Sequence, residues 1–253
     1  LSASPGECRE LPPARVAAAA VRLPPTGAVG GWAAARVLGI EPWMDDLPKS
    51  DVVEVGRLRL TSGPRTTFDG MRRAADLVEA VVFVDQMTHA EIVTGDEVRG
   101  YVDERPGWRG AAQARRAVDL GDPMARNAWE TRVRMVWMLA AGLPRPRCNP
   151  PVFDGYESLL GHPDLLDMEA GVVIEYDGSG HRRARQHDRD NLREERFERH
   201  GLVVMRVTRL DLDHVADLVA RMRSTRARGL ARDRRRDRWT LDIPPSWGAM
   251  DAF

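Results

Sequence analysis

Cysteine and long apolar stretches are both scarce in this sequence, and each scarcity excludes a class of protein. The two cysteines, Cys8 and Cys148, stand far apart and follow no metal-ligand spacing, so we expect neither a disulfide framework nor a zinc site. No apolar run approaches the roughly 18–20 residues that span a bilayer, and the Ala-rich residues 16–21 are too few for a signal-peptide core. We therefore expect a soluble, cytoplasmic protein, and a start at Leu1 rather than Met is consistent with missing initial residues.

Lysine is almost absent, because Lys49 is the one lysine among 38 basic residues. A bias in genome composition explains this pattern, but an arginine-rich surface also suits bidentate contacts with phosphate. The formal net charge is zero, which excludes neither nucleic acid nor protein as a partner.

The periodicity predicts an α+β protein with two parts and a tail. The breaker Gly121-Asp122-Pro123 marks the predicted boundary. Residues 1–122 predict a small, mostly helical domain with a β-hairpin, and residues 231–253 predict a weakly ordered tail. The hairpin is expected at residues 52–55 and 58–61 and the helices at residues 30–38, 68–87, 91–103 and 109–120.

The second part, residues 123–230, predicts a mixed sheet flanked by helices. A helix is expected to begin after Asn127, which caps it with Glu130 three residues on, and to end near residue 141. Residues 165–168 and 172–176 predict a hairpin, and the apolar residues 202–207 suit a buried strand. Further helices are expected at residues 186–200 and 210–223.

Two acidic residues on this predicted hairpin are the strongest indication of chemistry. Asp164 begins one strand, and Glu175 ends the apolar run of its partner. Both side chains are expected at one edge of the sheet, where a hard divalent cation would bind their oxygens. Without a cation the two charges would repel each other. The alternative is that Asp164 caps a turn and that Glu175-Tyr176-Asp177 only ends a strand before Gly178.

An ordered set of short motifs surrounds these acids. It comprises Glu130-Thr131-Arg132, Pro163-Asp164-Leu165, Glu175-Tyr176-Asp177-Gly178, His181, Asp190 with Arg193, Gly201, and Arg206-Val207-Thr208. This set resembles the very-short-patch-repair-like (Vsr-like) endonucleases of the PD-(D/E)XK nuclease superfamily. The resemblance implies a restriction-endonuclease-like fold that acts on DNA, and it implies that Asp164 and Glu175 bind Mg²⁺ or Mn²⁺.

The resemblance also implies roles for neighbouring residues. Asp177 stands where the superfamily motif has a lysine, and Vsr-like members use histidine instead, so His181 is the candidate general base or acid that prepares the water together with Asp177. The alternative for His181 is a loop histidine that is hydrogen-bonded to a carboxylate. Glu130 is a candidate for orienting the water of the metal, or alternatively only caps its helix. Asp167 is interpreted as a turn residue, with a role in metal binding as the alternative.

Arginines follow the acidic residues and are candidates for phosphate contacts. They are Arg182, Arg183, Arg189 and Arg193. The alternative is a solvated helix face paired with nearby acids. The nine arginines between residues 221 and 238 are interpreted first as a solvated helix or tail, and second as a source of affinity for nucleic acid.

The first part of the chain is similar to AbiEi-type antitoxins. The resemblance covers residues 30–39 and the run Arg59-Leu60-Thr61-Ser62-Gly63-Pro64-Arg65-Thr66 before the helix at Phe68. It implies a partial winged helix that binds DNA, and it makes a toxin a candidate partner. Arg65, Arg72 and Arg73 are candidate phosphate contacts or ordinary surface charges.

Two functions follow from these patterns, with an unrelated α+β protein as the third alternative. The leading hypothesis is a metal-dependent DNA endonuclease or nickase. The second is an antitoxin-like, DNA-binding transcriptional regulator whose nuclease-type domain no longer cuts.

Overall fold

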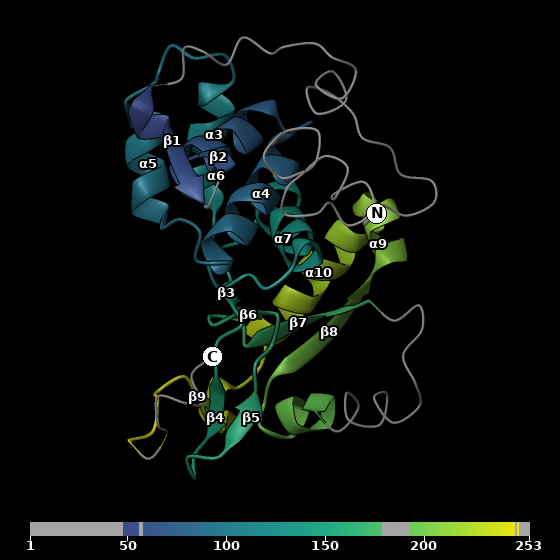
Figure 1. Cartoon of the computed structure of the whole chain (residues 1–253). Coiled ribbons are helices and arrows are strands. Elements are labelled where there is room, and N and C mark those ends of the chain that lie inside the picture. Colours follow the sequence, from purple (N-terminus) through teal and green to yellow (C-terminus); the bar gives the residue numbers. More distant parts are fainter. Residues whose placement is uncertain (1–47, 56–57, 179–192, 246, 248–253) are drawn as a thin grey trace, which may run out of the picture. The chain divides into compact units, whose positions relative to one another are not determined.

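The computed structural model describes residues 48–55, 58–178, 193–245 and 247. The chain divides into two compact units, residues 1–69 and 70–253. Both helices and a mixed sheet are present, which confirms the predicted α+β class (Figure 1). The helices predicted before residue 48 lie outside the described residues.

The first unit contains the predicted β-hairpin. Strands β1 (Val52–Val55) and β2 (Leu58–Thr61) pair antiparallel, and helix α3 (Gly63–Arg73) begins two residues later. Arg65 of α3 lies 2.9 Å from Asp51 and 2.8 Å from Asp69, and it is only 8% exposed. The structure therefore gives Arg65 a role inside this unit, which differs from the phosphate contact considered from the sequence.

The second unit begins with a helical layer. It comprises α4 (Leu77–His89), α5 (Gly95–Asp103), α6 (Ala111–Leu120) and α7 (Ala128–Met135), which continues as the π-helix η3 (Val136–Ala140). Asn127 caps α7 as predicted, because its Oδ1 accepts hydrogen bonds from the amides of Trp129 and Glu130.

The central sheet has the order β3-β6-β7-β8. Its strands are β3 (Arg147–Cys148), β6 (Leu165–Asp167), β7 (Val172–Asp177) and β8 (Val203–Thr208). The predicted hairpin β6–β7 is antiparallel, whereas β8 runs parallel to β7. A second, antiparallel sheet has the order β5-β4-β9, formed by β5 (Leu159–Gly161), β4 (Val152–Asp154) and β9 (Trp239–Thr240).

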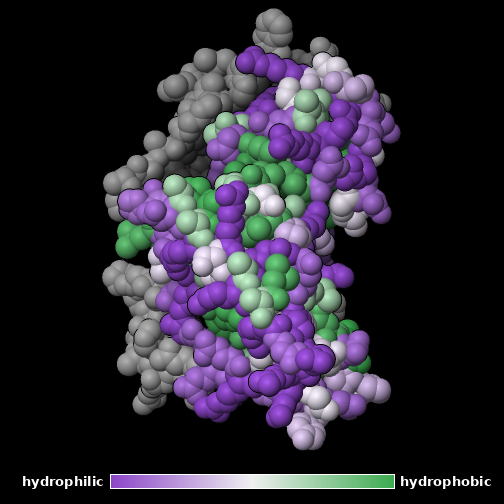
Figure 2. Space-filling view, turned by 180° about the vertical axis from the view of Figure 1, so that it is seen from behind, coloured by the Kyte–Doolittle hydropathy of each residue, from purple (hydrophilic) through white to green (hydrophobic). Residues whose placement is uncertain are grey.

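Each face of the central sheet packs into its own core, because successive side chains of a strand point to opposite faces. Val172 and Ile174 join the core that contains Val133, Trp137, Leu218 and Met222. Val173 joins the other core, whose members include Val152, Leu160, Phe197 and Leu202. Figure 1 shows α10 (Val215–Leu230) running beside the strands of this sheet. The face drawn in Figure 2 is mostly hydrophilic, with apolar residues in smaller groups between the polar ones.

Several predicted boundaries were wrong, and local caps explain most of the differences. The helix predicted over residues 68–87 is two helices, because Asp76 caps α4 by accepting a hydrogen bond from the amide of Glu79. The helix predicted from residue 91 begins at Gly95, because Thr94 and Glu97 form a capping box.

The C-terminal elements also differ from the prediction. The helix predicted over residues 210–223 is divided at His214 into α9 (Arg209–Asp213) and α10, which reaches Leu230. The predicted weakly ordered tail, residues 231–253, contains the 3-10 helix η4 (Arg234–Arg236) and strand β9. Strand β9 is held because Trp239 and Thr240 pair with β4. None of the helices in the described ranges is long and apolar enough to cross a membrane.

The predicted domain boundary at residues 122 and 123 does not match the division between the compact units. A buried polar network crosses that position and explains the difference. Asp85 of α4 lies 2.6 Å from Arg134 of α7, and both side chains are 0% exposed. The Asp85 carboxylate also accepts hydrogen bonds from the Thr131 hydroxyl and the Asp122 amide. These bonds join α4 and the Asp122 segment to α7, which packs on the sheet.

We predict that Asp85→Ala lowers the free energy of unfolding by about 3–5 kcal/mol, because it leaves the buried Arg134 without its counter-charge. Glu79→Ala is the matched control, because Glu79 also belongs to α4 and also pairs with an arginine of α7, Arg132, at 2.8 Å. That pair is partly exposed, so its loss should cost less than about 1 kcal/mol. Urea denaturation measures both values, and equal losses would contradict the prediction.

Candidate functional site

The pairing of β6 with β7 brings the two predicted acids together. Leu165 is opposite Ile174 and Leu166 is opposite Val173, so the continued register places Asp164 opposite Glu175. Directly opposed residues of an antiparallel pair lie on the same face, with Cβ atoms about 4.5–5.5 Å apart. The Oδ2 atom of Asp164 accepts a hydrogen bond of 2.7 Å from the amide of Tyr176. Asp164 is therefore held against the end of β7, as the sequence predicted.

Glu175 makes an ion pair with an arginine from the predicted charged helix. Arg193 Nη2 lies 2.5 Å from Glu175 Oε2, and the two side chains are 40% and 12% exposed. Residues 193–199 are helical, which confirms the described part of that prediction. The next residue, Glu194, pairs with Arg206, the register neighbour of Glu175 on β8. One helical turn thus supplies a positive charge to β7 and a negative charge to β8.

Glu130 lies close enough to Asp164 to be affected by its charge, and it is almost fully buried, at 4% exposed. Its Oε2 accepts hydrogen bonds of 2.8 Å from the Arg126 amide and from Asn149 Nδ2. Burial raises the pKa of the Glu130 carboxyl, and the nearby charge of Asp164 raises it further, whereas the two hydrogen bonds lower it. Glu130 therefore supports the start of its helix, and its role in orienting the water of a metal stays a prediction.

Asn149 connects Glu130 to Asp164 and was missed by the sequence analysis. Its amide donates to the Asp164 carbonyl at 3.1 Å, and its Nδ2 also donates to the Met124 carbonyl at 2.8 Å. The residue is 1% exposed and has a left-handed backbone, with φ of 47°. Asparagine tolerates this conformation better than most residues, and no pattern in the sequence indicates which asparagine adopts it.

A histidine, His162, is part of this region. His162 Nδ1 lies 3.4 Å from the Asn149 carbonyl oxygen. Burial lowers the pKa of His162, and the positive charges of Arg126 and Arg193 lower it further. The sequence analysis chose His181 instead, which lies outside the described residues. The position of His162, directly before Pro163-Asp164, was the signal that could have found it.

An aromatic stack lies beside the acids. Tyr176 follows Glu175 on β7, and its ring is stacked on Trp129 with centroids 5.5 Å apart and an angle of 7° between the planes. The guanidinium groups of Arg132 and Arg209 lie 4.7 and 5.7 Å from the centroid of the Trp129 ring. Asp177 is half-buried at the last position of β7. The stack fixes the helix start that carries Glu130 against the strand end that carries Glu175.

Asp167 is confirmed as a turn residue. Its Oδ1 accepts hydrogen bonds from the amides of Glu169 and Ala170 in the β6–β7 turn. Its Oδ2 lies 2.7 Å from Arg226 of α10, which also pairs with Glu169. The turn end of the hairpin is therefore attached to α10, far from the end that carries the paired acids.

The donor atoms fit a magnesium ion in kind, although not as a complete protein cage. Mg²⁺ is usually held by one or two carboxylates and keeps several waters, and Asp164 with Glu175 supplies two carboxylates. Within the described ranges, no three or more histidine, cysteine, aspartate or glutamate side chains are grouped as ligands of a metal. Arg193 already gives Glu175 a positive partner. His181, Arg182, Arg183 and Arg189 lie outside the described residues, so their predicted roles stay predictions.

We predict that Asn149→Ala lowers the free energy of unfolding by about 2–4 kcal/mol, because the Met124 carbonyl and the buried Glu130 carboxylate each lose a hydrogen bond and the left-handed backbone becomes strained. Asn149→Gly removes the same side chain but adopts a positive φ readily, so it should be less destabilising by about 1 kcal/mol. Thermal or urea unfolding compares the two variants. A glycine variant no more stable than the alanine variant would exclude a backbone contribution.

The comparison with protein families gives one match in this region. Residues 159–224 match the model of a family described as "Protein of unknown function (DUF2726)", which covers about a quarter of the 253-residue chain. The matched segment begins at β5 and ends within α10, so it includes Asp164, Glu175 and Arg193 but not Glu130. No curated protein and no solved structure matches the chain. The chain is therefore similar to this family over its central sheet.

Proposed function

We propose that the second unit is a Mg²⁺-dependent nuclease that hydrolyses phosphodiester bonds in DNA. The observation that carries the proposal is the register of β6 and β7, which sets Asp164 opposite Glu175 on one face of the sheet. Two carboxylates in that arrangement repel each other unless a cation lies between or beside them. The mixed sheet flanked by helices agrees with the resemblance to the PD-(D/E)XK superfamily.

Asp164 and Glu175 are the residues that would hold the ion in this proposal. A bound Mg²⁺ or Mn²⁺ supplies charge stabilisation at the phosphate and lowers the pKa of a coordinated water. The Tyr176 amide orients Asp164 by its hydrogen bond to Oδ2, and Asn149 holds the backbone of Asp164 and the side chain of Glu130. His181 remains the proposed general base or acid, and Asp177, at the end of β7, is proposed to prepare the water together with it.

Arg193 has two possible partners under this proposal. In the structure it neutralises Glu175, and the sequence pattern made it a candidate phosphate contact. Its side chain is 40% exposed, so its guanidinium is accessible to a phosphate group. A cation at Glu175 would repel the guanidinium, and a phosphate in the site would attract it. Arg193 therefore exchanges a carboxylate for a phosphate when ion and DNA are bound together.

A nicking assay tests the proposed activity. We expect the purified chain to nick supercoiled plasmid with Mg²⁺ or Mn²⁺ and not with EDTA. Asp164→Ala and Glu175→Ala should each lower the rate by about 100-fold or more, because each removes a charge that positions the ion. Glu169→Gln is the matched control, since Glu169 is an acid of the turn at the other end of the same hairpin. Unchanged nicking in both site variants would assign the cutting to a contaminant.

Metal binding is testable without DNA. A ligand that binds only the folded state at about 100 times its Kd stabilises that state by about 2.7 kcal/mol, so Mg²⁺ or Mn²⁺ should raise the melting temperature of the wild type. Asp164→Asn should abolish the rise. Arg193→Gln should reach the same rise at a lower ion concentration, because the competing guanidinium is gone. Equal ion dependence in all three proteins would exclude a cation at these acids.

A second candidate function is a DNA-binding protein whose nuclease-type unit no longer cuts. Two observations favour it: the ion pair between Glu175 and Arg193, and Asp177 in the place of the superfamily lysine. The similarity of the first part to AbiEi-type antitoxins adds a regulatory role and a toxin as partner. Two results together would favour this alternative. The protein would retard DNA in electrophoresis without nicking it, and divalent ions would leave its melting temperature unchanged.

A further inference from the structure

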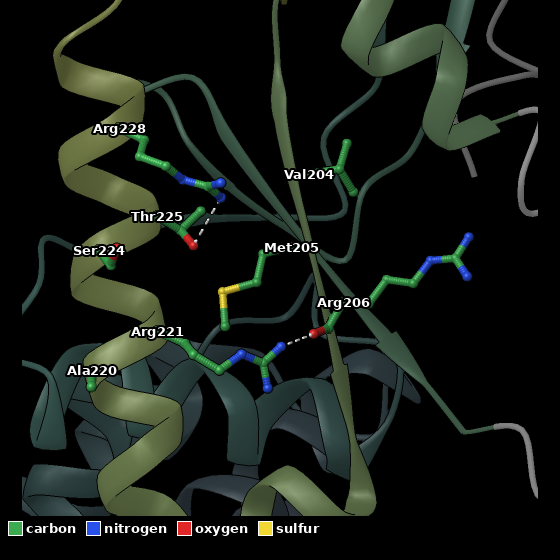
Figure 3. A pocket seen from close by; sticks show the side chains of 8 residues that line it. All are labelled: Val204, Met205, Arg206, Ala220, Arg221, Ser224, Thr225 and Arg228. Atoms are coloured by element: carbon green, nitrogen blue, oxygen red, sulfur yellow. Dashed lines mark hydrogen bonds between the residues drawn. The ribbon is translucent and has the colours of Figure 1, made fainter.

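A groove lies between β8 and α10, outside the acidic site (Figure 3). Its volume is about 570 Å³, and its lining includes Met205 and Arg206 of β8 and Arg221, Ser224, Thr225 and Arg228 of α10. Met205 is 5% exposed and forms an apolar part of the wall. The groove thus combines a small apolar surface with arginine and hydroxyl side chains, and no carboxylate of the described residues lines it.

The helical repeat explains why these side chains share the groove. Arg221, Ser224, Thr225 and Arg228 stand at spacings of three, four and seven residues, which place them on one face of α10. Leu218 and Met222 lie on the core side and are buried. Figure 3 shows the side chains of Arg221 and Arg228 extending from the helix toward β8, while the side chain of Arg206 points away from α10.

Arg221 closes the exposed edge of β8 against another strand. Its Nη2 donates to the Arg206 carbonyl at 2.9 Å, and the same side chain pairs with Asp211. In the described sheet β8 is the last strand, and an added strand would need its outward carbonyls. A side chain that already binds one of these carbonyls makes strand addition by a protein partner unfavourable.

Arg228 differs in its partners from most arginines between residues 221 and 238. Arg226 pairs with Asp167 and Glu169, and Arg234 pairs with Asp237. Among the described residues no carboxylate lies within ion-pair distance of Arg228, whose hydrogen bond goes to the Thr225 hydroxyl at 3.4 Å. Arg228 is exposed. Thr225 positions its guanidinium, and no acid of the described residues neutralises it.

We propose that this groove binds the phosphate backbone of DNA, with Arg228 as the principal phosphate contact and Arg221 beside it. Planar guanidinium groups bind phosphate oxygens in a bidentate manner. The groove borders β8, the strand next to β7. It lies on the face of the sheet that carries Met205 and packs against α10, whereas Arg206 and its register neighbour Glu175 belong to the other face (Figure 3). This proposal rests on DNA as the substrate of the proposed function.

The experiment measures binding of a fluorescein-labelled DNA duplex of mixed sequence to the full chain, by anisotropy, in EDTA at several salt concentrations. We expect Arg228→Gln to weaken binding by about three- to tenfold and to lower the salt slope by about one, as expected for the loss of one phosphate contact. Arg228→Lys keeps the charge and should keep the slope. Equal melting temperatures of the variants would show that each one folds.

The matched control is Arg235→Gln, because Arg235 belongs to the same basic segment, is 89% exposed, pairs with Asp233 and does not line the groove. A smaller loss of DNA affinity in this control than in Arg228→Gln supports DNA binding in the groove. Equal losses in both variants, or no loss in Arg228→Gln, overturn the proposal. Displacement of DNA by poly-glutamate at equal charge would instead indicate an acidic protein partner and would also overturn it. Because EDTA removes divalent ions, failure of nicking and failure of groove binding are separate results.

Discussion

The site depends on the fixed register of one strand, β7. Its first three residues are buried, Val172 and Ile174 on one face of the sheet and Val173 on the other. A slip of one residue would move each of these side chains to the wrong core, and burying one such side chain contributes about 1.5–3 kcal/mol. The apolar part of β7 therefore determines where its polar end lies. Glu175 faces Asp164 because the burial of Val172, Val173 and Ile174 in the two cores fixes the register of β7.

Opposed carboxylates are unfavourable unless positive charge compensates them. The structure provides that charge from the helix that contains Arg193, and Glu194 of the same turn compensates Arg206 on the next strand. This alternating arrangement keeps the sheet surface close to neutral. It also means that the positive partner of Glu175 can be exchanged, because Arg193 is accessible to solvent whereas the carboxylate is nearly buried.

Much of the architecture could be predicted from local patterns. The hairpins at residues 52–61 and 165–177, the strand β8 and the capped helix after Asn127 all follow from periodicity and from capping residues. The boundary between units could not be predicted, because Gly121-Asp122-Pro123 looks like a linker in sequence. In the structure the Asp122 amide binds the buried Asp85, which lies 37 residues earlier. Asn149 was missed for the same reason, since its role comes from contacts with Met124 and Glu130, which are distant in sequence.

Function was less accessible than fold. The pair of acids was found because both stand at the ends of apolar runs, a signal that local sequence carries. Arg193 was predicted to contact DNA or to pair with acids of its own helix, because its ion pair with Glu175 joins residues 18 positions apart. The groove beside α10 arises from side chains on a helix and a strand that only the fold brings together.

The attachment of the β6–β7 turn to α10 has a mechanical consequence. Arg226 binds Asp167 and Glu169 at one end of the hairpin, and the bond from the Tyr176 amide to Asp164 holds the other. Because both ends of the hairpin are held, β6 and β7 cannot separate at one end. The gap between Asp164 and Glu175 is therefore set by the spacing of the strands and keeps one width whether it is empty or filled.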